Sequence, residues 1–277
     1  MPGTLWLVGT PIGNLGDITE RARETLARAD VIACEDQPRT RGLLSHLGIP
    51  TPRLVTFNEG NEVRRVPELL DHLRAERTVA LITSAGMPAL SDPGYRLVAA
   101  CIGEGIPVDV VPGPSAAVAA LVLSGLPTGR FAFEGFLPRR VGARRAALGE
   151  LATEPRTMVL FESPRRLNDL LEDAAAALGE RRGVVARELT KIHQEVVRGT
   201  LPELRDRFAG KEVRGEVVVV IEGAGSQAAA AVSDAALAAE ARQLIAAGAR
   251  KREAAGEVAR RHGVAANRVY RTLVEGS

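Results

Sequence analysis

Short apolar runs alternate with amphipathic stretches along the first two thirds of the chain. In the amino-terminal part the alternation is regular, and strands alternating with helices are typical of a parallel sheet. The pattern predicts strands at 4–8, 30–34, 53–56, 78–83 and 106–111, and helices at 17–29, 38–47, 62–75 and 93–104. We therefore predict a doubly wound α/β domain at residues 1–126.

The same alternation predicts a second α/β domain at residues 127–223. Its strands are predicted at 130–136, 156–161, 183–188, 193–198 and 215–221, and its helices at 141–152, 164–178 and 201–208. No helix fits between the third and fourth of these strands, so they are predicted to pair antiparallel. A stretch rich in small residues, 223–231, predicts a linker to three short helices, and residues 224–277 form the predicted third part.

Composition and charge exclude several classes of protein. With 45% hydrophobic residues in 277, the chain can bury two cores, and its 36 basic and 34 acidic residues leave a net charge of only +2. The two cysteines and four histidines show no metal-binding spacing, so we expect no metal. The amino terminus lacks a basic region and the longest apolar stretch, 110–126, is interrupted by proline and glycine. We expect a soluble, cytoplasmic protein without a membrane segment.

Three loops rich in glycine and proline follow predicted strands, at 9–16, 82–94 and 111–116. Because ligands bind at the carboxyl ends of strands in open α/β sheets, these loops predict one pocket with many exposed backbone groups. None of them matches GxxxxGK[ST], GxGxxG or GxSxG. The main sequence support for a mononucleotide site, a dinucleotide site or a hydrolase is therefore missing. Asp17 and Glu20 after the first loop predict a capping box at the start of a helix.

Seven motifs in order give the chain a resemblance to a known family. They are Val8-Gly-Thr-Pro-Ile-Gly-Asn-Leu-Gly-Asp-Ile-Thr-Glu-Arg-Ala22, Ala33-Cys-Glu-Asp36, Ser91-Asp-Pro-Gly94, Pro112-Gly-Pro-Ser115, Glu134-Gly-Phe-Leu-Pro138, Phe161-Glu-Ser163 and Ala186-Arg-Glu-Leu-Thr-Lys191. In these motifs the chain resembles the tetrapyrrole-methylase superfamily, and most closely its branch that methylates small-subunit ribosomal RNA. The resemblance covers nearly the whole chain.

The resemblance implies a two-domain α/β fold with a cofactor cleft between the domains and a small helical segment at the carboxyl end. It implies an enzyme that moves a methyl group from S-adenosylmethionine to the ribose 2′-oxygen of a cytidine in small-subunit (16S) rRNA, free or within the 30S subunit. Members are usually homodimers and need no metal. The cofactor contacts that it implies are Pro11, Ser84, Ala85, Gly86, Met87, Ser115, Ala116, Phe161, Glu162, Leu189 and Thr190.

A ribose hydroxyl is a weak nucleophile, so a general base or a hydrogen-bond acceptor is expected near it. The acidic residues in family motifs that we consider catalytic candidates are Glu35, Asp36 and Glu188, with Glu162 as a further carboxylate. Asp36 has an alternative role as the cap of the following helix. Ser84 and Met87 stand where the family usually has aspartate and threonine, which removes a charge that another carboxylate would have to replace.

Basic residues near the family motifs predict RNA contacts through phosphate groups. These residues are Arg39, Arg139, Arg140 and Lys191, with Arg144 and Arg145 in the same cluster, and Arg250, Lys251, Arg252 and Arg268 in the tail. Residues 250–271 carry a local charge of +5, from seven Lys or Arg and two Glu, in a pattern that resembles a helix-turn-helix. The alternatives are solvated helix faces for the clusters and a structural or dimer-stabilising cap for the tail.

Two other functions remain open at the level of sequence. A tetrapyrrole methyltransferase of the same fold would act on a corrin or porphyrin, but it would have little use for the arginine cluster and the basic tail. A degenerate RNA-binding assembly factor would have lost cofactor binding through the changes at Ser84 and Met87. Cofactor affinity distinguishes the second of these from both enzymes.

Overall fold

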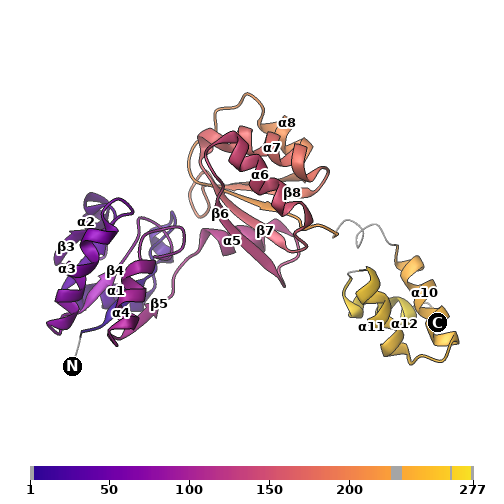
Figure 1. Ribbon diagram of the computed structural model, residues 1–277, viewed down its shortest axis with the longest axis horizontal. Coiled ribbons are helices and arrows are strands. Elements are labelled where there is room, and N and C mark those ends of the chain that lie inside the picture. The colour runs from indigo at the N-terminus through magenta and orange to yellow at the C-terminus, as the bar shows by residue number, and fades with distance from the viewer. Residues whose placement is uncertain (1–2, 226–232, 263, 276–277) are drawn as a thin grey trace.

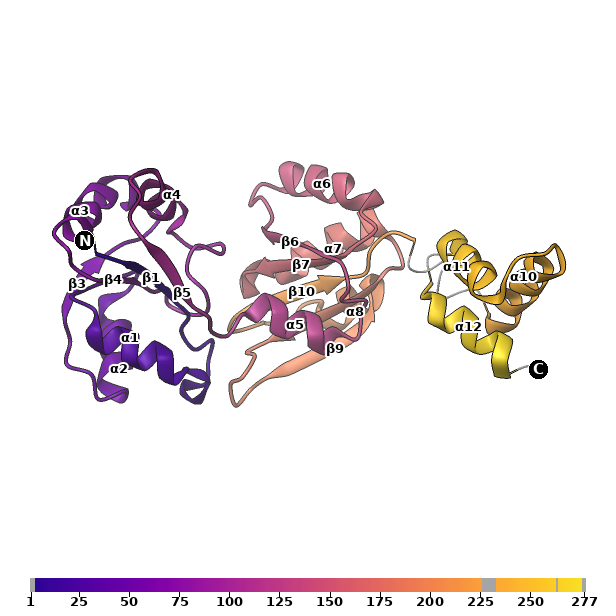
Figure 2. The ribbon, with the colours of Figure 1, turned by 90° about the horizontal axis from the view of Figure 1, so that it is seen from below.

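The computed structural model describes residues 3–225, 233–262 and 264–275. It shows two α/β domains, each built on a five-stranded sheet, followed by a group of three helices set apart from both (Figures 1 and 2). The predicted linker at 223–231 lies mostly outside the described residues, as does the glycine at position 263 in the predicted helix-turn-helix.

The first sheet is parallel throughout, as predicted. Its strands lie in the order β3 (Arg53–Thr56), β2 (Val31–Cys34), β4 (Val79–Leu81), β1 (Leu5–Val8) and β5 (Val108–Val111). Helices α1 (Glu20–Arg28) and α2 (Gln37–His46) bury apolar side chains on one face, and α3 (Glu62–Arg74) and α4 (Tyr95–Gly103) do so on the other. The sheet is buried on both faces, which explains its nearly continuous apolar strands.

The second sheet is mixed. Its order is β6 (Phe131–Phe136), β7 (Thr157–Glu162), β10 (Val217–Ile221), β8 (Arg182–Arg187) and β9 (Glu195–Thr200). Strands β6 and β7 pair parallel and all other neighbours pair antiparallel, so the predicted antiparallel pairing of β8 with β9 is confirmed. Helices α6 (Val141–Glu150), α7 (Leu167–Leu178) and α8 (Leu201–Phe208) cover one face of this sheet.

Helix α5 (Ala116–Ser124) covers the other face of the second sheet and was not predicted. The apolar stretch that contains α5 is flanked by prolines and glycines and shows no helical periodicity. Its nine helical residues were therefore not predicted as a helix. The predicted boundary after residue 126 assigned this segment to the first domain, whereas Ala117, Ala120 and Leu121 pack against β7, β8 and β10. We propose to keep the three-part division of the chain, with α5 grouped by its packing with the second domain.

The predicted capping box at Asp17 and Glu20 is wrong. Residues Leu15–Asp17 form a short 3-10 turn capped by Asn14, and α1 begins only at Glu20. Thr19 is the N-cap of α1, because its side chain accepts a hydrogen bond from the Ala22 N–H at 3.1 Å. The N-cap thus lies at Thr19, two residues after Asp17, where the capping box was predicted.

The carboxyl-terminal helices are α10 (Asp234–Ala246), α11 (Lys251–His262) and α12 (Ala266–Glu275). They pack on one another around their own small core, which includes Leu237, Val258 and Leu273. The three short helices predicted after the linker are therefore present. None of the helices within the described ranges is long and apolar enough to cross a membrane.

Candidate active site

The three glycine-rich loops predicted to form one pocket do converge. Thr10 of the first loop and Gly86 of the second exchange two backbone hydrogen bonds, at 2.9 and 3.1 Å. The Gly113 N–H of the third loop donates to Met87 Sδ at 3.3 Å. A Cβ on Gly9 would lie 2.6 Å from Gly113, so glycine is required where these loops cross. Parallel strands bring their carboxyl ends to the same edge, and hydrogen bonds then tie the loops together.

The same loops contact the second domain. Ile12 of the first loop is buried in the core between α5 and the second sheet. Gly135 in β6 approaches the second loop so closely that a Cβ there would lie 3.1 Å from Ser91 Oγ. Gly13 packs against the side chain of Lys191 in the loop between β8 and β9. The ligand loops of the first domain therefore form the boundary with the second domain.

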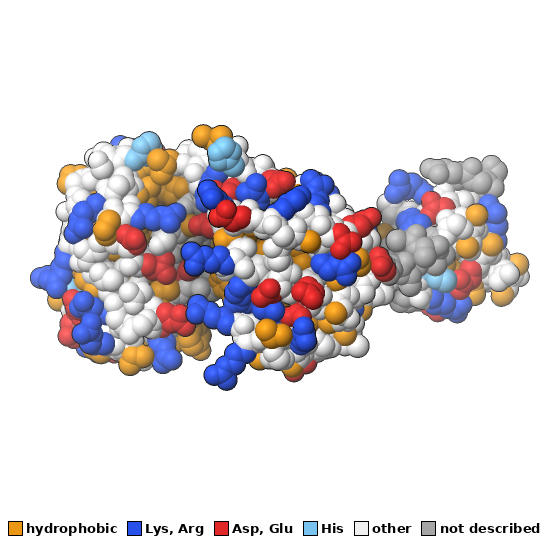
Figure 3. Space-filling view, turned by 90° about the horizontal axis from the view of Figure 1, so that it is seen from above, with side chains coloured by type: hydrophobic (Ala, Val, Ile, Leu, Met, Phe, Trp, Pro, Cys, Tyr) orange, Lys and Arg blue, Asp and Glu red, His pale blue; other side chains and the backbone are white. Residues whose placement is uncertain are grey.

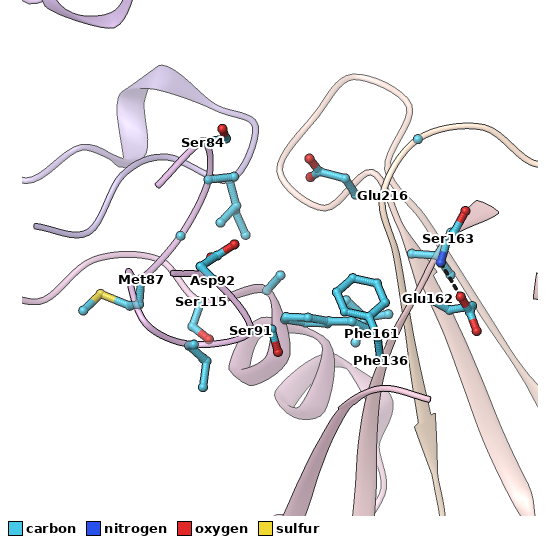
Figure 4. Close-up of a pocket in the computed structure, with 18 of the residues that line it drawn as sticks. Ser84, Met87, Ser91, Asp92, Ser115, Phe136, Phe161, Glu162, Ser163 and Glu216 are labelled. Carbon is cyan, nitrogen blue, oxygen red and sulfur yellow. Dashed lines mark hydrogen bonds between the residues drawn. The ribbon is translucent and has the colours of Figure 1, made fainter. Parts of the chain in front are cut away.

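A cavity of about 380 Å³ lies at this boundary (Figure 4). Ser84, Asp92 and Ser115 line one side of it, and Phe136, Phe161 and Glu216 line the other. The remaining lining residues are Ile12, Glu35, Ala85, Gly86, Met87, Leu90, Ser91, Ala116, Glu162, Ser163, Pro164, Gly215, Val217 and Val218. The volume is in the range of small-molecule sites.

Nine of the predicted site residues line this cavity. They are Glu35, Ser84, Ala85, Gly86, Met87, Ser115, Ala116, Phe161 and Glu162. Pro11 and Arg39 line a separate, smaller hollow between the first loop and α2, which Ser84 also borders. Leu189 is buried in the core beneath α5, and neither it nor Thr190 is among the residues that line the cavity.

Two of the three predicted catalytic carboxylates have other structural roles. Asp36 is the N-cap of α2 and accepts a hydrogen bond from the Arg39 N–H at 2.9 Å, so the alternative role considered for it is confirmed. Glu188 binds Lys191 Nζ at 2.8 Å and the Glu216 N–H at 2.9 Å, outside the residues that line the cavity. Of the three, only Glu35 faces the cavity.

Asp92 is the carboxylate that the sequence analysis did not consider. It lies in the second loop and lines the cavity together with Glu35. Burial, and then the negative charge of Glu35, raise the pKa of Asp92 to about 7. Its motif, Ser91-Asp-Pro-Gly94, carries the family resemblance, but Asp92 lies nine residues beyond the end of the predicted strand, so nothing local marked it as a site residue.

Glu35 places a carboxylate next to Ser84. Its Oε2 accepts a hydrogen bond from the Ser84 N–H at 3.0 Å, which brings a carboxylate from the end of β2 to the second loop. Met87 has a structural role, because its sulfur lies between the first and third loops. Four acidic residues line the cavity, and of these Glu35 and Asp92 come from the first domain, on the side of Ser84.

Comparison with known proteins decides the family. Residues 4–205 match the family model of the Tetrapyrrole (Corrin/Porphyrin) Methylases. The chain belongs to the tetrapyrrole methylase family. The Mycobacterium tuberculosis protein named "Ribosomal RNA small subunit methyltransferase I" is 47% identical over 99% of this chain and 95% of its own length. The protein of that name from Thermotoga maritima is 49% identical over 80% of this chain and 99% of its own.

Solved structures of tetrapyrrole methylases share the fold. Cobalt precorrin-4 methyltransferase has a TM-score of 0.60 at 21% identity, with 79% of this chain and 94% of that chain covered. The uroporphyrin-III C-methyl transferase of Thermus thermophilus, solved as a complex with S-adenyl homocysteine, has a TM-score of 0.57 at 23% identity, with 79% and 97% covered. The predicted family and the predicted two-domain fold are thus both confirmed, and this methylase is a transferase of methyl groups.

The methylase cavity has a rigid aromatic side. The ring of Phe161 lies 4.9 Å from that of Phe133 and 5.6 Å from that of Phe136, both in tilted or edge-on contact. Phe136 is 55% exposed and presents a ring to the opening. Glu162 behind them is buried, and it accepts hydrogen bonds from the Ser163 N–H and from Arg166. Burial raises the pKa of Glu162, and these contacts fix the turn that follows β7.

Several basic residues predicted to contact RNA have intramolecular partners. Arg144 is buried and pairs with Asp173 at 2.7 Å, so the prediction that Arg144 faces RNA is wrong. Arg145 pairs with the same carboxylate at 2.7 Å, but its side chain is exposed and its contact with RNA stays a prediction. Lys191 binds Glu188 and Glu216, and Arg268 binds Asp234. Their neighbours Arg139 and Arg140 are exposed before α6, as are Arg250, Lys251 and Arg252 around the start of α11.

No group of three or more His, Cys, Asp or Glu within the described ranges could hold a metal ion.

Backbone strain is found in the loops around the cavity. Ala89 and Ser91 in the second loop, and Glu188 and Thr190 after β8, have positive φ angles without being glycine. Such conformations persist only where the surrounding contacts hold them, and they are frequent at functional sites.

Glu62 is the residue that holds the second loop in place. Its Oε1 accepts hydrogen bonds from the Gly94 N–H at 3.0 Å and the Arg96 N–H at 3.3 Å, and the carboxylate is nearly buried. We expect Glu62→Ala to destabilise the protein by about 2 kcal/mol, because it leaves a buried N–H without an acceptor. Urea unfolding measures this, with the exposed Glu59→Ala as control; equal stability of the two variants would contradict the role.

Proposed function

We propose that this methylase transfers a methyl group from S-adenosylmethionine to the ribose 2′-oxygen of a cytidine in small-subunit ribosomal RNA. The observation that carries the proposal is the pair of carboxylates, Glu35 and Asp92, in a cavity between two domains of a tetrapyrrole methylase fold. The substrate class is supported by relatives named for small-subunit rRNA methylation at 47% identity along the whole chain.

The cavity fits the proposed cofactor in size and chemistry. Backbone groups of Ser84–Met87 offer donors and acceptors to an adenosine and an amino acid, and Glu35 and Asp92 offer negative charge to a sulfonium and an ammonium group. Ser115 and Ala116 begin α5, a nine-residue helix whose N-terminus suits a carboxylate. Pro11, Leu189 and Thr190 stay predicted contacts around this cavity.

When bound, the cofactor supplies a methyl group that is already activated by the positive sulfur. The protein then has to hold the ribose hydroxyl near that methyl group and accept its proton. Asp92 is suited to accept the proton, since a pKa of about 7 lets it be ionised in part of the molecules at neutral pH and yet bind a proton readily. Burial raises that pKa, and the charge of Glu35 raises it further. Phe136 and Phe161 offer rings on which a flipped base can stack.

A tetrapyrrole substrate is the alternative, since the solved relatives act on corrins and porphyrins by name. Those proteins are 21% and 23% identical to this chain, and a similarity at this level shows the fold alone. The relatives named for rRNA are about twice as similar.

We also propose that the enzyme is a homodimer without a metal, acting in the cytoplasm where ribosomal subunits are made. The exposed valines Val118 and Val122 of α5 offer one apolar face for a second copy.

Methyl transfer to isolated small subunits tests the proposal. We expect tritium from labelled S-adenosylmethionine to appear in one 2′-O-methylcytidine of subunits taken from cells that lack this protein, and not in subunits from wild-type cells. Label transfer to a tetrapyrrole and none to subunits would favour the alternative substrate. Absence of cofactor binding at millimolar concentration would instead favour the degenerate assembly factor.

A further inference from the structure

We propose that a basic trough on the second domain binds the phosphodiester backbone of RNA next to the methylated nucleotide. The trough consists of two hollows beside the cavity, and the loop 209–216 between α8 and β10 forms one wall of both. This inference rests on the proposed function, because it names the path of the same substrate. It involves none of the basic residues that the sequence analysis selected.

The hollows are continuous with the catalytic cavity. Pro164 and Gly215 line both the cavity and the first hollow, which has a volume of about 470 Å³. Lys211 and Val213 line both the first hollow and the second, which has a volume of about 200 Å³. An RNA strand with one nucleotide in the cavity can therefore lay its neighbouring nucleotides along the loop 209–216.

Positive charge dominates this trough. Arg165, Lys211 and Arg207 are exposed and form no ion pair within the described part of the chain. The other two cations of the trough are each matched by one carboxylate. Arg214 pairs with Glu212 at 3.1 Å, and Arg187 pairs with Glu195. Three unmatched positive charges beside a cavity suit phosphate groups.

Basic side chains are also visible on the second domain in the space-filling view. Lys and Arg side chains gather along the edge of the second domain that faces the first domain, next to the gap between them (Figure 3). The Thermotoga maritima relative, which bears the rRNA methyltransferase name, is matched over 99% of its length by only 80% of this chain. That relative is shorter by about a fifth, so it bears the same name with fewer residues available for RNA contacts.

The test compares two double variants on small subunits. Arg165→Ala with Lys211→Ala removes two unpaired charges of the trough, and Arg28→Ala with Arg64→Ala removes two exposed charges on α1 and α3 as the matched control. We expect the trough variant to raise the KM for subunits at least 10-fold, with kcat and the Kd for S-adenosylmethionine unchanged. The slope of log KM against log salt concentration should fall by about 1.4 to 1.8, the value for two phosphate contacts.

Glu212→Gln tests the same idea in the opposite direction. It removes a negative charge from the trough and releases Arg214, so the KM for subunits should fall several-fold. A trough variant within twofold of the control, with an unchanged salt slope, would overturn the inference. If the wild-type protein methylates no subunits, the proposed function fails instead, and filter binding of subunits by the same variants still decides whether the trough binds RNA.

Discussion

We expect Asp92→Asn to lower kcat for methyl transfer by about 10²- to 10⁴-fold, the range for loss of a general base. The amide has nearly the same shape as the carboxyl group but cannot accept the proton of a ribose hydroxyl. Stopped-assay kinetics with saturating subunits measure the loss, and a Kd for S-adenosylmethionine within a few-fold of wild type separates it from failed cofactor binding.

The pH profile adds a second readout for Asp92. With a pKa of about 7, the carboxyl group is protonated at lower pH, so kcat/KM should rise with pH through about 7 in the wild type. Glu35→Gln removes the charge that helps raise this pKa, and the rise should move to lower pH. An Asp92→Asn variant with full kcat, or a Glu35→Gln profile that does not move, would contradict the assignment.

The raised pKa of Asp92 predicts an effect on stability opposite to the effect on activity. Its pKa is raised in the folded state above the value near 3.9 in the unfolded chain, so folding binds a proton and stability falls as pH rises from about 4 to 7. Asp92→Asn should therefore be at least as stable as the wild type at pH 8 while it is far less active. A drop in the melting temperature would instead indicate a structural role.

The largest effect on stability is expected for Asp173→Ala. Arg144 and Asp173 have side chains that are each only 3% exposed, and their charged groups lie 2.7 Å apart. Removing the carboxylate leaves the buried guanidinium of Arg144 with only a longer contact of 3.7 Å to the exposed Asp169, and we expect a cost of about 3 kcal/mol, near the lower end for a broken buried ion pair. Calorimetry should show a loss of about 10 °C in the melting temperature of the α/β part, given its size.

Asp206→Ala is the matched control, because its partner Arg205 also lies 2.8 Å away but both side chains are exposed. That substitution should cost less than about 1 kcal/mol. Burial alone would raise the pKa of Asp173, but hydrogen bonds from Arg145 and Arg144 lower it below its usual value. The ion pair thus stabilises the folded protein at pH values above the pKa of Asp173 in the unfolded chain, and this effect is lost in acid. The stabilities of the wild type and of Asp173→Ala should therefore converge as pH falls. Equal losses for both substitutions at pH 7 would contradict this account.

Local sequence patterns were enough to predict the strands, most of the helices and the family. Alternating runs of strand and helix length are local signals, and the parallel first sheet and the β8–β9 hairpin followed from them. The convergence of the three glycine-rich loops was also predictable, because parallel strands end at one edge. Helix α5 was missed because its nine residues lie between prolines and glycines and are apolar on nearly every side.

Which charged residues line the cavity follows from the folded structure and could not be predicted from local sequence. Glu35 and Asp36 are adjacent in sequence, yet one faces the cavity and the other caps α2, because successive residues at a strand end point in different directions. Arg144 has the same local sequence signal as Arg139 but is buried against Asp173, 29 residues further along the chain. Asp92 became a candidate base only because folding buries it beside Glu35, from a strand that is distant in sequence. A side chain's pKa and partners depend on what the fold brings near it, and local sequence does not carry that information.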